Sequence, residues 1–567
     1  VQGDAAREAV CFESGDNAWF VDLDGTAGTA VTVQRRHPNP KVGETAWDVG
    51  RFVVSNELNA FTFTSTRLKN DGSGFEANVN WYATSGLGSL EKFGAGDVRF
   101  NFRFEDAFPV EIHAGRFIAG SGSDYVGEWY GCLGSLYKPH DIVFAAGTTL
   151  RLAANTVFGT LNSATAPTLH LNGATLDFAA SGQQNFPKTV FNDARLAFSA
   201  WQSRFYYSND TDYLGTVPYA YAVNDITSAD SVPTVTFGRN RSYVNVTVAD
   251  ITGNAAPDLV FSNRLVDVAR VQGTVTYYGL NTFRKKGAGT LAFHNGLSTT
   301  TGSFEVVEGT LEIGGHDANH FDMTRTGIGN VNPAVERTIT VQKGATVDFK
   351  SKLGVMNGPR NWMLRIDGGT LRSSAGPAIQ LGALELNDAT LEIREPYRGW
   401  LPYGYFGVTR LLKIGGTKPF TFALPETNRD QAFLTIGFTD ADRREELDPV
   451  QRPGFTNLWS VLEMDVADVT GSDAVDATIA LIVRDMYNMT WRTDSDFSSN
   501  GGWGNDVNPY RGYRFLGGIR KTGAGTLRLT NVNTYSHTTE VAEGVLEVDG
   551  SIAASSGVTV EAGAYLA

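Results

Sequence analysis

The feature that most constrains the fold of this chain is an internal repeat. Three segments contain Gly-Ala-Gly followed by alternating apolar residues, and they begin at Lys92, Lys286 and Lys521. A second strand pattern follows each of them, at 110–117, 304–313 and 540–548. A chain with such repeats stacks similar units and does not fold around one unique centre. The sequence therefore predicts a solenoid.

Shorter patterns of the same kind recur between these copies. Each consists of an alternating apolar strand, a turn rich in Gly, Asn or Asp, and another alternating strand: 142–152, 169–178, 339–349, 364–371 and 384–393. A period of two places the aliphatic and aromatic residues on one face. Taken alone, such a turn is typical of an antiparallel hairpin. Recurrence at intervals of roughly 20–30 residues, with Thr-Leu after the turn, favours stacked parallel coils instead.

These residues resemble the strand repeat of bacterial autotransporter passenger regions and related large surface proteins, a lysine-led Gly-x-Gly-Thr-Leu unit. The segment from Lys521 to Ala567 matches it most fully, with Asn533-Thr534-Tyr535 and Glu543-Gly544 in place. The copy at Lys92 has Asp97-Val98 where Thr-Leu is expected. The resemblance implies an all-β fold, a right-handed parallel β-helix with irregular insertions. It also implies an extracellular or cell-surface location, with the parent protein associated with the outer membrane, and it brings no catalytic residues.

Length and charge are compatible with this interpretation. The 567 residues exceed the roughly 250–300 at which one compact core stops growing, a limit that a solenoid avoids. A net charge of −14 disfavours nucleic acid and anionic membranes as partners. No apolar run reaches ~18 residues, so we expect no membrane insertion by this segment. Val1 opens no export-signal pattern, and the chain ends within a strand pattern at Tyr565–Ala567. We therefore expect a piece of a longer protein, or one held by a partner.

The rhythm of the strands divides the chain into six stretches. We expect an irregular or capping segment at 1–88, coils at 89–199, an aromatic-rich insertion or irregular coils at 200–280, coils at 281–393, an insertion with irregular coils at 394–489, and a further, truncated repeat module at 490–567. The last boundary rests on Thr490-Trp491 and Trp503, which resemble the opening that precedes such repeats in large surface proteins.

Two sets of residues raise the question of cross-links and metals. Cys11 and Cys132 are the two cysteines of the chain and could form one disulfide between the N-terminal segment and the early coils; two separately buried thiols are the alternative. Asp494, Asp496, Ser498 and Asn500 alternate oxygen ligands as calcium loops do, but no bidentate Glu follows. A polar loop is the other interpretation, and we expect no cofactor besides calcium.

Candidate chemistry is sparse. Phe20–Thr26 copies the first motif of haloacid-dehalogenase-like phosphotransferases, in which Asp22 would be the nucleophile. No helix-forming segments follow that could build the required sheet, so we interpret the match as coincidence. Trp400, Tyr403 and Tyr405 form an aromatic loop that could stack on sugar rings or contact a protein, or simply cover the flank of the solenoid.

The function that these observations favour is a non-enzymatic, exported bacterial cell-surface scaffold or adhesin that presents loops for binding. Its partners would be carbohydrate or a host or cell-surface protein, with self-association as a further option. Two alternatives stay open. One is a polysaccharide-degrading enzyme, a lyase or glycoside hydrolase on a β-helix, although no Asn-Thr-Asp, Gly-His-Gly or Arg-Ile-Lys signature is present. The other is a subunit of an extracellular filament or sheath, to which the open final strand points.

Overall fold

The computed structural model describes part of the chain, and all structural statements below concern that part. The described residues are 17–22, 31–37, 50–68, 75–77, 88–101, 107–120, 130–135, 140–154, 157–158, 167–180, 183–198, 204–207, 211–213, 219–220, 234–237, 243–261, 264–265, 269–272, 275–278, 282–294, 302–314, 337–350, 362–373, 379–393, 405–423, 433–436, 457–485 and 514–567. They fall into two compact units, Val1–Leu259 and Val260–Ala567. In these ranges the regular elements are strands, and none is a helix that could cross a membrane.

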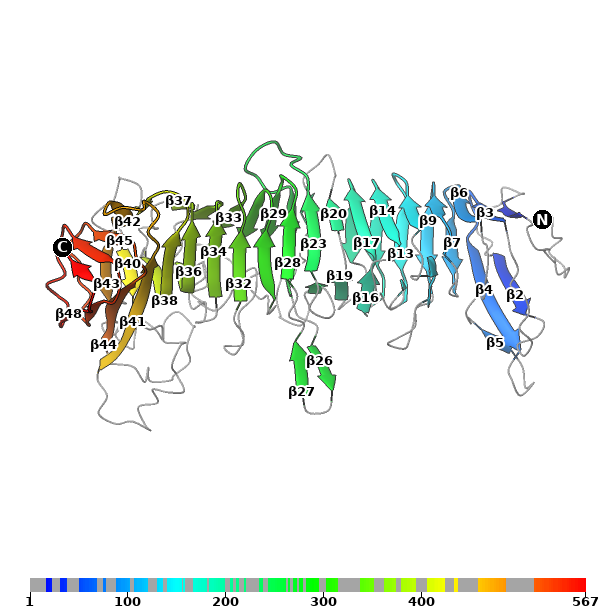
Figure 1. The fold of residues 1–567 in the computed structure, drawn as a ribbon. Coiled ribbons are helices and arrows are strands. Elements are labelled where there is room, and N and C mark those ends of the chain that lie inside the picture. The colour runs from blue at the N-terminus through cyan, green and yellow to red at the C-terminus, as the bar shows by residue number, and fades with distance from the viewer. Residues whose placement is uncertain are drawn as a thin grey trace, which may run out of the picture. The chain divides into compact units, whose positions relative to one another are not determined.

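The first unit is built from two long parallel sheets (Figure 1). One contains β1 (Ala18–Val21), β3 (Arg51–Ser55), β6 (Ser89–Phe93), β8 (Val110–Ile112), β12 (Asp141–Phe144), β14 (Thr168–Asn172), β17 (Lys188–Asn192), β20 (Thr211–Tyr213) and β23 (Tyr243–Val248). The other contains β2 (Val31–His37), β4 (Phe61–Leu68), β7 (Asp97–Phe100), β9 (Arg116–Ala119), β13 (Thr149–Leu152), β15 (Thr175–Phe178) and β18 (Arg195–Phe198). From β1 and β2 to β17 and β18, each coil therefore adds one strand to each sheet.

Smaller elements accompany these sheets. A third set of parallel strands consists of β16 (Gln183–Phe186), β19 (Arg204–Tyr207) and β22 (Thr234–Phe237). Two antiparallel pairings also occur, β5 (Phe75–Ala77) on β4 and β10 (Tyr130–Gly131) with β11 (Gly134–Ser135). Strand β21 covers Tyr219–Ala220, and β24 (Leu259–Phe261) lies at the division between the units.

The second unit repeats the arrangement. Its first sheet contains β28 (Thr282–Lys286), β30 (Ser303–Val306), β32 (Arg337–Val341), β34 (Trp362–Asp367), β36 (Ile379–Asn387), β38 (Tyr405–Gly415), β41 (Asn457–Val466), β44 (Arg514–Thr522), β46 (Thr539–Val541) and β48 (Val558–Val560). Opposite them lie β29 (Thr290–Phe293), β31 (Thr310–Ile313), β33 (Thr346–Phe349), β35 (Thr370–Ser373) and β37 (Thr390–Ile393). They are succeeded by β39 (Phe420–Phe422), β42 (Val475–Ile479), β45 (Thr526–Leu529), β47 (Val545–Val548) and β49 (Tyr565–Leu566).

Three further elements complete this unit. Strands β40 (Phe433–Ile436) and β43 (Ile482–Asp485) pair in parallel, and β40 also pairs with the first residues of β38. Strands β26 (Ala269–Gln272) and β27 (Val275–Tyr278) form an antiparallel hairpin, and β25 covers Arg264–Leu265. In Figure 1 the hairpin projects from the layer of parallel strands.

The prediction of a parallel β-helix is confirmed. Every single-coil pattern singled out in the sequence forms two strands that pair with the neighbouring coils and not with each other. In the pattern 169–178, for example, β14 pairs with β12 and β17, while β15 pairs with β13 and β18. The turn between them needs a left-handed residue, which is Gly173 at a φ of 65°. Glycine adopts that conformation without steric cost, so the chain changes sheet there.

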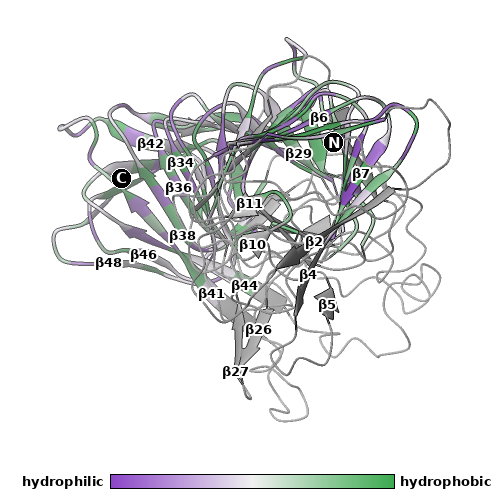
Figure 2. Ribbon diagram, turned by 90° about the vertical axis from the view of Figure 1, so that its right-hand side faces the viewer, coloured by the Kyte–Doolittle hydropathy of each residue, from purple (hydrophilic) through white to green (hydrophobic). Residues whose placement is uncertain are grey.

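The core follows the period of two. In β13 and β15 the side chains of Leu150, Leu152, Leu176 and Phe178 are fully buried. Arg151, between two of these leucines, lies on the opposite face of β13 and pairs with Asp177. Figure 2 shows the same alternation of hydrophobic and hydrophilic residues along β34, β36 and β38. Because each coil buries its aliphatic residues against the coils on either side, the stability of one coil depends on its neighbours.

Candidate functional site

The most regular polar feature of the molecule is a turn that we call the repeat corner, with the sequence Lys-x-Gly-Ala-Gly. Its three instances are 92–96, 285–289 and 521–525. The lysine side chain is almost completely buried in each, at 1%, 0% and 0% relative exposure. A buried ammonium is costly unless its protons are hydrogen-bonded, so the partners of these lysines decide whether the corner is stable.

All three ammonium groups have the same partners. Lys521 Nζ donates to the carbonyl oxygens of Thr522 (2.8 Å), Gly523 (2.7 Å) and Glu543 (3.1 Å). Lys285 Nζ donates to the equivalent three at 2.9, 2.6 and 3.0 Å. Lys92 Nζ donates to its own three at 2.6, 2.6 and 3.3 Å. Two acceptors belong to the corner itself, and the third belongs to the coil that follows.

Burial affects the protonation of these groups. It lowers the pKa of Lys92 and of Lys521 to about 8, and nearby carboxylates act in the opposite direction. For Lys521 these are Asp465, Glu543 and Asp476. Three carbonyl acceptors use all three N–H protons of an ammonium group, whereas a neutral amine has only two. The corner is therefore built around the charged form of lysine.

The structure corrects the sequence analysis at the second copy. The sequence pattern begins that copy at Lys286, but the buried lysine is Lys285, and Lys286 supplies one of the carbonyl acceptors. Counting back from Gly-Ala-Gly in the other copies places one residue between the lysine and the first glycine. The spacing Lys-x-Gly could have revealed this from the sequence.

A glycine in the following coil lies directly against each corner. Gly115, Gly309 and Gly544 have φ values of 73°, 65° and 66°. A Cβ on Gly309 would lie 2.5 Å from the carbonyl oxygens of both Gly287 and Gly289. A Cβ on Gly115 or Gly544 would lie 2.5–2.6 Å from the equivalent carbonyl oxygens of its own corner. The following coil can approach this closely only because it has no side chain at that position.

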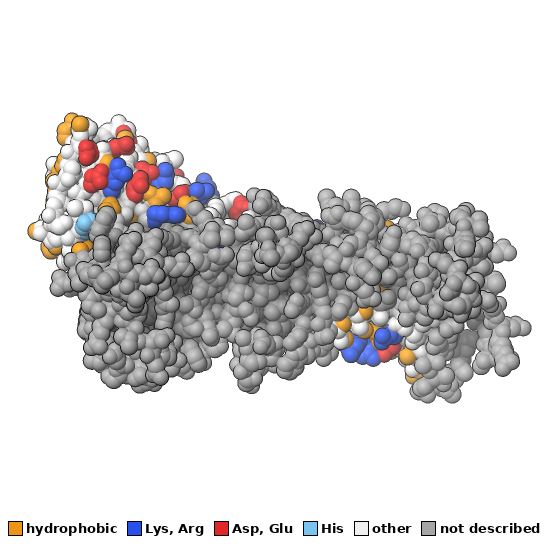
Figure 3. All heavy atoms as spheres, turned by 90° about the horizontal axis from the view of Figure 1, so that it is seen from below, with side chains coloured by type: hydrophobic (Ala, Val, Ile, Leu, Met, Phe, Trp, Pro, Cys, Tyr) orange, Lys and Arg blue, Asp and Glu red, His pale blue; other side chains and the backbone are white. Residues whose placement is uncertain are grey.

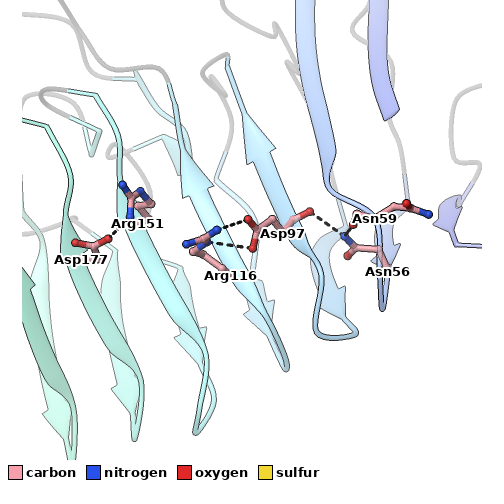
Figure 4. A network of polar contacts seen from close by, with 6 residues as sticks. All are labelled: Asn56, Asn59, Asp97, Arg116, Arg151 and Asp177. Atoms are coloured by element: carbon pink, nitrogen blue, oxygen red, sulfur yellow. Dashed lines mark hydrogen bonds and ion pairs between the residues drawn. The ribbon is translucent and has the colours of Figure 1, made fainter. Parts of the chain in front are cut away.

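Ion pairs between neighbouring coils cover the outward faces. In the first unit Asp97 of β7 binds Arg116 of β9, and Arg151 of β13 binds Asp177 of β15 at 2.7 Å (Figure 4). In the second unit Arg365 pairs with Glu385 (2.6 Å) and Arg520 with Glu540 (3.1 Å). Figure 3 accordingly shows acidic and basic side chains interspersed over the described C-terminal strands. Over these described strands, charges of opposite sign therefore lie next to one another.

One ion-pair cluster is more deeply buried than the rest. The carboxylate of Glu312 has a side-chain exposure of 3% and binds His294 Nε2 at 2.7 Å and Lys350 Nζ at 2.6 Å. Burial alone would raise the pKa of Glu312, but His294 and Lys350 outweigh that effect and the pKa lies below its usual value of 4.5. The three residues lie on successive coils, so this cluster also joins neighbours.

The Glu312 cluster gives a pH-dependent prediction. Because the folded-state pKa is lowered, its stabilisation is fully present above pH 4.5 and is lost as the pH falls through the folded-state value. We expect Glu312→Gln to be less stable than wild type by about 1–3 kcal/mol at pH 7, with a smaller difference at pH 3. Urea unfolding at both pH values measures this. The exposed Glu392→Gln should cost about 0.5 kcal/mol or less. A Glu312→Gln difference that does not change with pH would contradict the assignment.

A pair of matching loops escaped the sequence analysis. In Asp250–Asp258 and Asp468–Asp476 the last aspartate accepts the N–H groups of the second and third loop residues, at 2.8–2.9 Å. The first aspartate accepts the N–H of Gly253 or Gly471 (2.8 and 2.7 Å). Both loops follow Val-Ala, so the repeated string Val-Ala-Asp-x-Thr-Gly was the available signal. Asp476 also accepts the N–H of Thr526 at 2.7 Å, which shows that its role is structural.

The residues singled out in the sequence have mixed outcomes. Trp400, Tyr403, Asp494, Asp496, Ser498, Asn500 and Cys11 lie outside the described residues; of Tyr405 the structure gives its place as the first residue of β38. The aromatic-loop site, the calcium loop and the disulfide therefore stay predictions. Cys132 is buried, with Sγ 3.7 Å from the carbonyl oxygen of Phe100. Asp22 accepts the N–H groups of Leu58 and Asn59 at 3.0 and 2.9 Å.

The described residues contain no group of three or more His, Cys, Asp or Glu side chains that could hold a metal ion. What they contain instead is a series of corners, ion pairs and loops that join each coil to the next. The fold and these contacts define a repeat solenoid, a class of protein in which neighbouring units supply one another's stability.

Comparison with known proteins gives the repeat its family. A family model described as passenger-associated-transport-repeat matches residues 283–313 and 519–548, and the chain therefore carries this repeat at two sites. An extracellular serine protease of Serratia marcescens is 44% identical over 64 residues, which are 11% of this chain and 6% of that relative. No solved structure matches the chain. The resemblance to autotransporter passenger repeats is thereby confirmed. The corner at 92–96 has the same geometry as the two matched copies.

Proposed function

We propose that this chain is part of the passenger region of an exported bacterial surface protein, where it acts as a non-enzymatic scaffold that presents loops for binding. The observation that supports this most is the presence of passenger-associated repeats within a parallel β-helix. In such a solenoid the strands are engaged with one another, so a ligand would meet the loops between them. The partners would be carbohydrate or a cell-surface protein.

Two measurements test this proposal. In cells that carry the intact parent gene, a protease added to the medium should cleave the protein, because a passenger on the cell surface is accessible from outside. Protection from the protease until the cells are lysed would contradict the surface location. The purified chain should bind glycans on an array or the surface of cells, and both assays are run with calcium and without it. Incubation with glycans should release no product. Product release would favour the polysaccharide-degrading alternative.

The similarity to an extracellular serine protease supports a second candidate, that this chain belongs to the passenger of a proteolytic enzyme. In the described residues Ser536 Oγ donates to Asp485 Oδ2 at 2.5 Å, whereas a nucleophilic serine is activated by an imidazole that lies between it and the carboxylate. If the chain belongs to a protease, we expect the catalytic groups elsewhere in the parent protein. Hydrolysis of casein by the purified chain, abolished by a serine-directed inhibitor, would contradict that expectation.

A further inference from the structure

Each repeat corner shares its buried ammonium between two coils. In the corner at 521–525, two acceptors of Lys521 come from the next two residues and the third is the Glu543 carbonyl, 22 residues further along the chain. The corners at Lys92 and Lys285 have the same division, with Ala114 and Glu308 as the residues of the following coil. The hydrogen bonds of the lysine are therefore complete only when the next coil is in place.

A corner without its following coil would be unfavourable. The ammonium would lose one of its three carbonyl acceptors, and a hydrogen bond to a charged group is stronger than one between neutral groups. The following coil depends on the corner in turn, because Gly544 packs against the carbonyl oxygens of Gly523 and Gly525 with no room for a side chain. The corner and the following coil therefore stabilise each other, and we expect them to form together.

A second contact strengthens this coupling in two of the three corners. The carboxylate of Glu543 accepts the N–H of Gly523 at 3.1 Å, and that of Glu308 accepts the N–H of Gly287 at 2.9 Å. The first corner has Ala114 at this position, and there the carboxylate of Glu57 on the preceding coil accepts the N–H of Ala95 at 3.1 Å instead. The molecule thus contains two versions of the same corner, one with the acidic residue on the following coil and one with it on the preceding coil.

We propose that the repeat lysine is a conformational latch, which makes the closure of one coil conditional on the coil that follows it in the sequence. The unit of stability around each corner is then a pair of coils. Lys92, Lys285 and Lys521 each hold one such pair together, and the acidic residue before the glycine reinforces the latch where it is present.

Native-state hydrogen exchange on the full chain tests this proposal. In Lys521→Met the unbranched, uncharged side chain is one atom shorter and leaves three carbonyls without their donor. We expect exchange to rise by roughly tenfold or more in both 521–529 and 539–548, with 362–393 unchanged. Lys413→Met removes an exposed lysine that is paired with Asp465 at 2.9 Å in the same sheet, and it should change exchange in 539–548 little.

The outcomes separate a latch from a local contact. A rise that is confined to 521–525, with 539–548 as protected as in the wild type, would overturn the proposal, as would no rise at all. If Lys521→Met does not fold, Glu543→Gln supplies a milder test, in which a smaller rise must again appear in both segments. In the first corner, Ala114→Glu should slow exchange across 110–119; faster or unchanged exchange there would contradict the reinforcing role of the carboxylate.

Discussion

Replacement of Gly309 by alanine is expected to destabilise the second unit by about 3–5 kcal/mol. Two effects combine at this position. The residue has a φ of 65°, which costs an L-amino acid about 1–2 kcal/mol. The new Cβ would also lie 2.5 Å from two carbonyl oxygens of the preceding coil, Gly287 and Gly289, which belong to the turn between the paired strands β28 and β29. Urea unfolding of the full chain measures the cost.

Gly344→Ala is the matched control. Gly344 has a φ of 80°, and a Cβ there would meet no atom within 4 Å. The variant therefore contains the backbone strain without the clash, and we expect a loss of about 1–2 kcal/mol. Equal losses for the two variants would show that the coils are not as close at the corner as the structure places them.

Replacement of Phe100 by alanine should be of similar severity in the first unit. Phe100 is fully buried, and its ring centroid lies 4.9 Å from that of Phe63 and 5.1 Å from that of Phe117, on the coils before and after it. Truncation removes stacking with both neighbours and leaves a cavity that parallel strands at fixed spacing cannot close. We expect a loss of about 3–5 kcal/mol.

Two further variants define how this loss arises. Phe100→Leu keeps most of the volume and should cost about 1.5 kcal/mol or less. Phe93→Ala removes a phenylalanine that is 36% exposed and stacks on His113 at the surface, so we expect a loss well below that of Phe100→Ala. Chemical unfolding followed in the first unit gives all three values. A loss for Phe93→Ala that equals that of Phe100→Ala would contradict the buried packing of Phe100 between Phe63 and Phe117.

The architecture could be predicted from the sequence because its determinants are local and repeated. In the second unit, strands β29, β31, β33, β35 and β37 each begin with a threonine in register with the next. The threonine after each turn reports that register directly, and it is followed by Leu in four of these strands and by Val347 in β33. The alternation of Thr370, Leu371 and Arg372 then fixes which residues face the core.

The contacts between coils could not be predicted in the same way, because they join residues that are far apart in the sequence. The spacing Lys-x-Gly identifies Lys285 as the lysine of the second corner, but its third acceptor, the Glu308 carbonyl, lies on the following coil. The cluster around Glu312 depends on Lys350, which lies on the next coil. The number of residues between Glu312 and Lys350 is set by the loop that connects the two coils. Spacing within one coil says nothing about which side chains of the next coil it meets.

The central claim, parallel stacking of coils, is tested most directly by cysteine cross-linking in β35 and β37. In the structure Arg372 and Glu392 are register partners on adjacent coils, so Arg372→Cys/Glu392→Cys should form a disulfide readily. An antiparallel hairpin about Gly368 and Gly369 would instead pair Arg365 with Arg372. We predict fast cross-linking of the first pair and none of Arg365→Cys/Arg372→Cys; the reverse result would contradict the fold.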